Sequence, residues 1–180
     1  MFRLFVAIEI PDPVKAQLAG LQNGLPGARW RPDEVLHLTL AFIGDTDRHG
    51  FEDAVDALAG IDAPAFSLTL ADVGYFGDRK PRAVWAGVKR EDALLHLQDK
   101  VEAALRRYGF ELERRKFTPH VTLAYLKRAN VMEVKTYCAV NGGFTSPSFA
   151  VKEFSLFSSQ MGGDFSHYEI EARYSLSSSR

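Results

Sequence analysis

The chain has 180 residues, of which 46% are hydrophobic and 25% are charged, and its formal net charge is −1. This composition is typical of a globular domain with a substantial core, and it excludes a polycation that coats nucleic acid without specificity. The single cysteine, Cys138, excludes an internal disulfide and a zinc site built on cysteines. No apolar run approaches the ~20 residues that span a bilayer, and there is no signal-peptide pattern, so we expect a cytoplasmic protein.

The first half of the chain predicts alternating strands and helices. Strands are indicated where β-branched, aromatic and alternating apolar residues gather, over 2–10, 28–31, 37–43 and 66–75. Helices are indicated by apolar residues at spacings of three and four, over 12–24 and 51–60. Asp12 is expected to cap the first of these helices, with Pro13 at its first position.

The second half repeats this order. Its strands are expected over 82–88, 120–126, 149–157 and 168–176, and its helices over 91–108 and 131–140. A hairpin turn is expected at 161–164. The repetition indicates an internal duplication within one domain of residues 1–180. Its lobe halves are expected at about 1–78 and 79–160, with a closing strand within 165–176.

Each half contains the pattern His-x-Thr-x inside a predicted strand. Residues 37–43 read HLTLAFI and residues 120–126 read HVTLAYL, with the two histidines 83 residues apart. Side chains alternate between the faces of a strand, so each histidine shares a face with its threonine. These pairs are His37 with Thr39 and His120 with Thr122. The opposite face of the first strand is expected to carry Leu38, Leu40 and Phe42.

Two histidines that face one pocket can bind a metal, pack structurally, or act as an acid and a base. A metal usually needs a third ligand, often a carboxylate, and neither motif has one on the same face. A purely structural role would have to explain why the same His–Thr pair occurs in both halves of the chain. Acid–base catalysis at phosphorus uses both, because one imidazole takes a proton from the attacking group while the other protonates the leaving oxygen. The threonine hydroxyls can then donate to the phosphate oxygens, and no metal or cofactor is expected.

The two motifs, their spacing and the duplicated halves resemble the two-histidine (2H) phosphoesterases. Within that superfamily the chain is most similar to the RNA 2′,3′-cyclic phosphodiesterases, also called 2′-5′ RNA ligases of the LigT/ThpR type. The resemblance covers nearly the whole chain. The stretches that carry it are RLFVAI at 3–8, RWRP at 29–32, HLTLAFIG at 37–44, RAVWAG at 82–87, FTPHVTLA at 117–124, and the terminal strands at 154–158 and 168–176.

The resemblance implies a bilobal α+β fold, with two antiparallel sheets related by pseudo-twofold symmetry, helices outside and a central cleft. It implies hydrolysis of a 2′,3′-cyclic phosphate at an RNA end to a 2′-phosphate, and a reverse joining reaction with a 5′-hydroxyl. His37 would be the proton donor and His120 the proton acceptor, and Thr39 and Thr122 would hold the phosphate. A monomer is expected. Many members carry Arg after the second motif, where this chain has Tyr125, so Lys127 and Arg128 would supply the charge.

Other basic and aromatic residues are candidate contacts for RNA. Arg115 stands in the basic run 114–116 before the second motif, and Arg29 and Arg31 stand before the first, where each can meet a phosphate or simply be solvated. Four aromatic residues can either stack on a base or pack in the core: Trp30, Tyr75, Phe76 and Tyr125. No role is assigned to the histidines that lack a threonine partner, which are His49, His96 and His167.

Two other functions remain open from the sequence. The same chemistry can act on 2′-5′ oligonucleotides or on small cyclic nucleotides. A binding module for RNA ends can use the histidines only as phosphate ligands, and turnover separates this module from the enzymes.

Overall fold

The computed structural model describes residues 1–162 and 165–178. Its strands are β1 (Phe2–Glu9), β2 (Ala28–Trp30), β3 (His37–Thr46), β4 (Phe66–Leu68), β5 (Leu70–Phe76), β6 (Ala83–Val88), β7 (His120–Leu126), β8 (Phe149–Val151), β9 (Glu153–Gly162) and β10 (Phe165–Ser175). Its helices are α1 (Asp12–Ala19), α2 (Arg48–Ala59), α3 (Asp92–Arg107), α4 (Val131–Val140) and the short 3₁₀ helix η1 (Asp33–Val35). In the part of the chain that is described, no helix has the length and apolar character needed to cross a bilayer.

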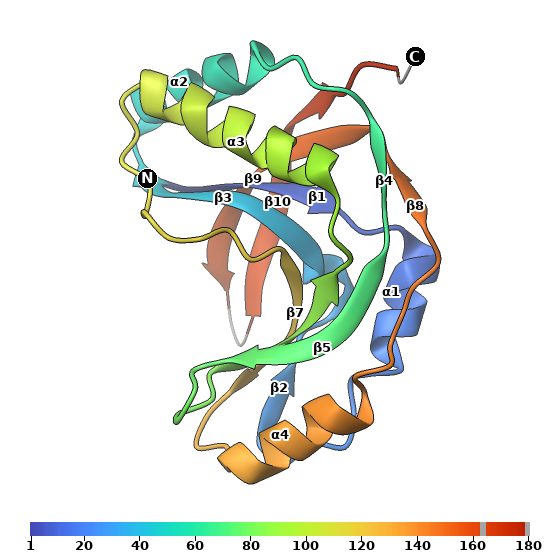
Figure 1. Ribbon diagram of the computed structural model, residues 1–180. Helices are drawn as coiled ribbons and strands as arrows, with labels where there is room; N and C mark the ends of the chain where they lie inside the picture. The colour runs from blue at the N-terminus through green and yellow to red at the C-terminus, as the bar shows by residue number, and fades with distance from the viewer. Residues whose placement is uncertain (163–164, 179–180) are drawn as a thin grey trace.

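The main sheet confirms the predicted α+β fold with antiparallel strands. Its order is β10-β9-β1-β3-β7-β6-β5, with β2 paired to β7, and β4 and β8 form a separate two-stranded sheet. Strands β3 and β7 meet at the centre through one register pair, Leu38 with Val121. Two separate sheets were expected. The structure instead joins two half-sheets into one through this narrow seam, because β3 and β7 run side by side only where the two motifs begin (Figure 1).

The two half-sheets do not coincide with the two halves of the sequence. Strand β5, which ends the first repeat, pairs with β6 of the second, and β9 of the second repeat pairs with β1 of the first. The helices follow the same exchange, since α2 packs against α3 while α4 lies against β5 (Figure 1). The expected lobe bounds at 1–78 and 79–160 therefore mark the repeat in the sequence and not the two units in space.

The core lies between the sheet and these helices. The apolar stripe predicted for the longest helix is buried at Leu94, Leu97, Val101 and Leu105, each at most 1% exposed, whereas its last predicted member, Tyr108, is 47% exposed beyond the end of the helix. Burying each such side chain contributes about 1.5–3 kcal/mol before the cost in conformational entropy. A second, smaller cluster of Phe5, Ala7 and Phe157, with Tyr168 packed against it, lies apart from this core.

Two predictions for the first helix need correction, and the predicted strands 66–75 and 149–157 are each split into two strands. The first helix ends at Ala19 rather than near Gly24, because Gly24 has a φ of 75° and lies in the loop that follows. Asp12 is inside the helix and not its cap, since Pro11 is the N-cap residue and no side chain caps the first turn. The predicted hairpin turn at 161–164 lies partly outside the described residues.

Candidate active site

The two His-x-Thr motifs face each other across the central seam. In both strands the alternation holds for the first four residues, with the histidine and threonine partly exposed and the intervening residues buried. Strands β3 and β7 are antiparallel, and Leu38 pairs with Val121. Each histidine therefore lies across from the threonine of the other motif. The structure therefore places the two motifs side by side, and their use as one site stays a prediction.

A β-bulge directly follows each threonine. In β3 the partners of Ala7 and Val6 are Thr39 and Ala41, so Leu40 is an extra residue. In β7 the partners of Trp85 and Val84 are Thr122 and Ala124, so Leu123 is extra in the same way. A bulge shifts the alternation by one residue, so the residue after each buried Leu-Ala pair returns to the face of the histidine.

The bulges bring Phe42 and Tyr125 onto the site face. Their exposed fractions are 51% and 50%, whereas Leu40 and Ala41 are 2% and 7% exposed. The expectation that Phe42 shares the core face with Leu38 and Leu40 is wrong, because strict alternation holds only for a regular strand. Leu-Ala in each motif thus gives two buried residues in succession, which is the burial pattern that the bulge produces.

Both imidazoles are fixed by the same main-chain contact. The Nδ1 atom of His37 lies 2.7 Å from the carbonyl oxygen of Val35, and the Nδ1 atom of His120 lies 2.7 Å from that of Thr118. A carbonyl oxygen only accepts, so Nδ1–H is the donor in both contacts and Nε2 carries the lone pair of the neutral ring. Each histidine thus presents Nε2 as the atom that can gain or lose a proton.

Aromatic rings surround each histidine. The His37 ring lies 4.8 Å from Phe5 and 5.3 Å from Tyr168, and the His120 ring lies 4.9 Å from Phe76 and 6.0 Å from Trp85. This packing removes water from both imidazoles and disfavours their charged forms.

The pKa values of both histidines are lowered. Burial lowers the pKa of His37 to about 4; the Val35 carbonyl opposes this shift, while the charges of Arg31, His120 and Lys15 add to it. Burial also lowers the pKa of His120, with a smaller contribution from Arg115. In the free protein at neutral pH both rings are therefore neutral, and an anion bound between them would restore the charged form.

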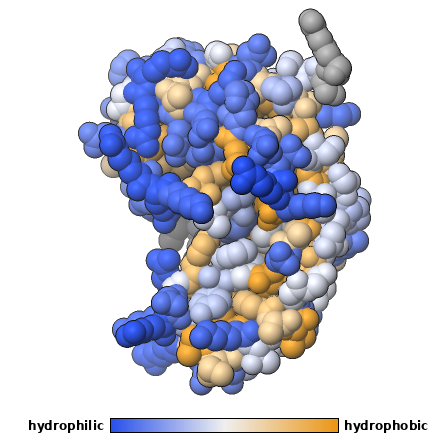
Figure 2. Space-filling view, in the orientation of Figure 1, coloured by the Kyte–Doolittle hydropathy of each residue, from blue (hydrophilic) through white to orange (hydrophobic). Residues whose placement is uncertain are grey.

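Two cavities flank the motifs. One of about 610 Å³ is lined by Thr39, His120 and Thr122. The loop before β7 and the end of the β5–β6 hairpin border this cavity, where the left side of the surface in Figure 2 is hollowed. The other cavity, of about 700 Å³, is lined by His37. The two histidines thus line different cavities, and they come from the two strands that pair at Leu38 and Val121.

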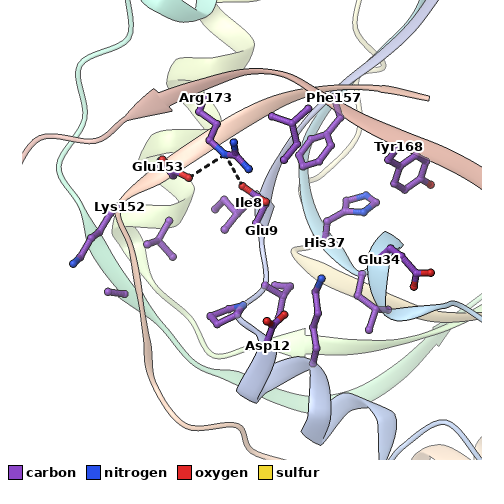
Figure 3. A pocket seen from close by; sticks show the side chains of 17 residues that line it. Ile8, Glu9, Asp12, Glu34, His37, Lys152, Glu153, Phe157, Tyr168 and Arg173 are labelled. Atoms are coloured by element: carbon purple, nitrogen blue, oxygen red, sulfur yellow. Dashed lines mark hydrogen bonds and ion pairs between the residues drawn. The ribbon is translucent and has the colours of Figure 1, made fainter. Parts of the chain in front are cut away.

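The second cavity combines apolar and charged walls. His37 lies at one side of it beside Phe157 and Tyr168 (Figure 3). At another side Arg173 pairs with Glu9 at 3.3 Å and with Glu153 at 3.4 Å. Glu9 is the cross-strand neighbour of His37, yet its carboxylate is turned to Arg173. Within residues 1–162 and 165–178, no group of three or more His, Cys, Asp or Glu side chains is placed to hold a metal ion.

The structure separates the predicted substrate contacts into two groups. Arg115 and Tyr125 line the cavity of His120, and Arg115 also pairs with Glu113 at 3.1 Å. Lys127 and Arg128 follow the last residue of β7, are exposed, and line neither cavity. Proximity in sequence to the second motif therefore does not bring all four residues into the site.

The aromatic candidates divide in the same way. Phe76 and Tyr125 line the cavity of His120, whereas Trp30 packs against Tyr137 and the Tyr75 hydroxyl bonds to the carbonyl of Asp78. Sequence reasoning missed Phe42 and Tyr168. Phe42 was hidden by the bulge, and Tyr168 is brought to His37 only by the pairing of β10 with β9.

Comparisons with known proteins identify similar chains. The family model for the 2′-5′ RNA ligase superfamily matches residues 10–163, which include both motifs. An RNA 2′,3′-cyclic phosphodiesterase of Geobacillus stearothermophilus is 38% identical over 127 residues, which are 67% of this chain and 40% of that protein. The match thus spans less than half the length of that relative.

Two further similarities extend over almost the whole chain. An RNA 2′,3′-cyclic phosphodiesterase of Escherichia coli is 33% identical over 179 residues, covering 97% of this chain and 96% of that protein. Among solved structures, that of E. coli LigT complexed with 3′-AMP superposes with a TM-score of 0.80 at 27% identity, over 97% of this chain and 98% of the other. The matched region therefore spans both half-sheets and the positions of both motifs.

Proposed function

Because this chain belongs to the 2′-5′ RNA ligase superfamily, we propose that it hydrolyses the 2′,3′-cyclic phosphate at an RNA end to a 2′-phosphate. The observation that carries the proposal is the pair of imidazoles on adjacent strands that are fixed through Nδ1 in the same way. Their Nε2 atoms are proposed to face one bound phosphate. Relatives named RNA 2′,3′-cyclic phosphodiesterase support the substrate class.

The proposed reaction uses one proton transfer at each histidine. Nε2 of His120 takes a proton from a water molecule, whose oxygen attacks phosphorus. The bond from phosphorus to O3′ breaks, and O3′ takes the proton from Nε2 of His37. The products are a free 3′-hydroxyl and a 2′-phosphate, and each histidine ends in the protonation state that its partner began with. The hydroxyls of Thr39 and Thr122 donate to the non-bridging oxygens, where negative charge develops.

The substrate itself provides the charge that this scheme needs. His37 has to be protonated to act as the acid, whereas burial holds its pKa at about 4 in the free protein. A phosphate anion beside the imidazole favours the charged form and raises this pKa. The acid is then charged only in the presence of substrate.

Contacts beyond the phosphate follow from the cavity of His120. Arg115 and Tyr125 line it and are proposed to contact the nucleotide, and Lys127 and Arg128 remain proposed contacts for a longer RNA. A single chain supplies both motifs, which supports a monomeric enzyme.

A small cyclic nucleotide is a second candidate substrate, because a cavity of about 610 Å³ has the size of a small-molecule pocket. Joining to a 5′-hydroxyl uses the same groups in the same roles, because the 5′-hydroxyl replaces water: it loses its proton to His120, its oxygen bonds to phosphorus, and O3′ leaves with the proton of His37.

The test is an assay on an oligoribonucleotide that ends in a 2′,3′-cyclic phosphate, with excess chelator present. We expect a 2′-phosphate product in chelator, and its loss in His37→Ala and His120→Ala. A 3′-phosphate product would contradict the assigned bond cleavage. Activity that chelator abolishes and zinc or manganese restores would contradict the metal-free mechanism. A parallel assay on nucleoside 2′,3′-cyclic monophosphates separates the two candidate substrates.

A further inference from the structure

The main chain of Arg31 is held by hydrogen bonds, and its side chain contacts one lining residue of each cavity although Arg31 itself lines neither. Its backbone N–H donates to the carbonyl of Leu123 at 2.8 Å, and its own carbonyl accepts from Nε2 of Gln22 at 2.8 Å. The same Gln22 amide also donates to the carbonyl of Leu123 at 3.1 Å. The main chain of Arg31 is thereby tied to the second motif strand, directly before Ala124 and Tyr125.

The guanidinium of Arg31 bridges one side chain from each cavity. Its Nη2 donates to the Tyr168 hydroxyl at 3.1 Å, and its Cζ lies 5.0 Å from the ring centroid of Tyr125. Tyr168 lines the cavity of His37, and Tyr125 lines the cavity of His120, Thr39 and Thr122. The Arg31 charge also reaches the His37 imidazole, where it lowers the pKa.

This charge has no carboxylate partner among residues 1–162 and 165–178, although Arg31 is partly buried. A desolvated guanidinium without a counter-ion costs free energy, which an anionic ligand would recover. The Tyr168 hydroxyl occupies one of the five N–H donors of the guanidinium, and the fork is well suited to phosphate oxygens. A cation that has no carboxylate partner in this part of the chain and contacts one lining residue of each cavity is suited to bind a phosphate.

Arg3, in β1, provides the contrast. Its Cζ lies 5.6 Å from the ring of Phe42, which occupies the same place after the first bulge as Tyr125 after the second. Arg3, however, has a carboxylate 3.9 Å away, that of Asp45, and is about half exposed. The two arginines therefore share an aromatic contact and differ in whether their charge is already balanced.

We propose that Arg31 is the phosphate-binding cation of this site and holds a non-bridging oxygen of the substrate phosphate between the two histidines. Naming the substrate as RNA rests on the proposed function, whereas the binding of a phosphate group does not. Arg31 acts together with Tyr168, which fixes one edge of the guanidinium, and Tyr125, which supports its face.

The first test is the binding of inorganic phosphate, measured by titration calorimetry on the full chain. Arg31→Met should weaken the affinity about 10- to 100-fold, because a charge-assisted interaction is lost. Arg31→Lys should lie between Met and wild type, since Lys keeps the charge without the planar fork. Arg3→Met is the matched control and should change the affinity less than about twofold, as expected for a surface side chain. Equal phosphate affinity in Arg31→Met and wild type would overturn the proposal, provided that both melt at similar temperatures.

The second test is the pH dependence of kcat/KM on an oligoribonucleotide with a 2′,3′-cyclic phosphate. Removing the Arg31 charge should raise the pKa of His37. The limb of the profile that His37 controls should therefore move to higher pH in Arg31→Met. A purely structural role of Arg31 would not cause this shift. An unmoved limb would overturn the placement of Arg31 beside His37.

Loss of phosphate affinity in Lys127→Met or Arg128→Met but not in Arg31→Met would assign the cation to the end of β7 instead. If wild type binds phosphate through Arg31 but does not cleave the RNA, the proposed function fails and this inference stands.

Discussion

At the scale of single residues, the site depends on atoms that the main chain orients. His37 and His120 each donate Nδ1–H to the carbonyl two residues earlier, so rotation of either ring would break a hydrogen bond of 2.7 Å. The same strands place Thr39 and Thr122 on the face of the histidines. The chemistry therefore depends on four side chains whose positions follow directly from two short strands.

The pH profile tests the two histidines as a coupled pair. We expect bell-shaped profiles, because one ring must be protonated while the other is neutral. The basic limb of kcat should lie at higher pH than the basic limb of kcat/KM, because kcat reports the enzyme–substrate complex and kcat/KM reports the free protein. Burial lowers the pKa values of both histidines in the free protein, and the bound phosphate raises them in the complex. Steady-state rates from pH 4 to 9 give both profiles. If the basic limbs of kcat and kcat/KM lie at the same pH, the bound phosphate does not raise the pKa of His37.

The threonines give a prediction on rate without a change of fold. Thr39→Val and Thr122→Val keep the shape of the side chain but remove a donor to the phosphate. Each should lower kcat/KM about 10- to 1000-fold, the scale of losing one oxyanion donor. Cyclic-phosphate hydrolysis and circular-dichroism melting, measured on the same samples, separate chemistry from folding. Normal kinetics in both variants would remove the threonines from the proposed mechanism.

At the scale of elements, the two bulges decide which side chains reach the site. Leu40 and Leu123 each add a residue to their strand, and Phe42 and Tyr125 consequently leave the core face. The repeats carry the same bulge at the same distance from the histidine, so the two half-sheets present equivalent aromatic rings beside the two motifs. The β-bulge is thus one of the features that the two repeats share.

Stability measurements can test this placement. Leu40→Ala should lower the free energy of unfolding by about 2–5 kcal/mol, the usual effect of truncating a buried leucine. Phe42→Ala should cost less than about 1 kcal/mol, because half of its side chain is already exposed. Urea denaturation of both variants provides the comparison. A regular strand would bury Phe42, and its truncation would then cost about 3–5 kcal/mol.

At the scale of the whole molecule, the exchange of strands and helices ties the two repeats together. The site lies at the seam where β3 and β7 meet, and each half-sheet needs a strand from the other repeat, β5 or β9. The Tyr137 hydroxyl of α4 donates to the carbonyl of Leu21 after α1, which adds a buried contact between the repeats. Neither repeat can complete its own half-sheet.

Fragments of the chain test this interdependence. Residues 1–78 alone leave β5 without β6 and β1 without β9, and should show no cooperative thermal transition. Residues 79–180 alone should behave in the same way. Mixing the two should restore circular dichroism and cyclic-phosphate hydrolysis, if the fragments refold together. A cooperative transition in either isolated fragment would show that a repeat is stable without its exchanged strand.

The sequence by itself determined the order of the elements, the duplication, and the two polar pairs, because alternation and apolar spacing are local properties. It also determined the family, since the motifs and their spacing carry that information. Only the tertiary structure decided that Phe42 faces the site, because a bulge exists only relative to a partner strand with one residue fewer. It likewise decided the neighbours of Arg31, since Tyr168 is 137 residues away along the chain and arrives through the pairing of β10 with β9. Contacts between distant segments depend on which strands pair, and no local pattern of residues encodes that choice.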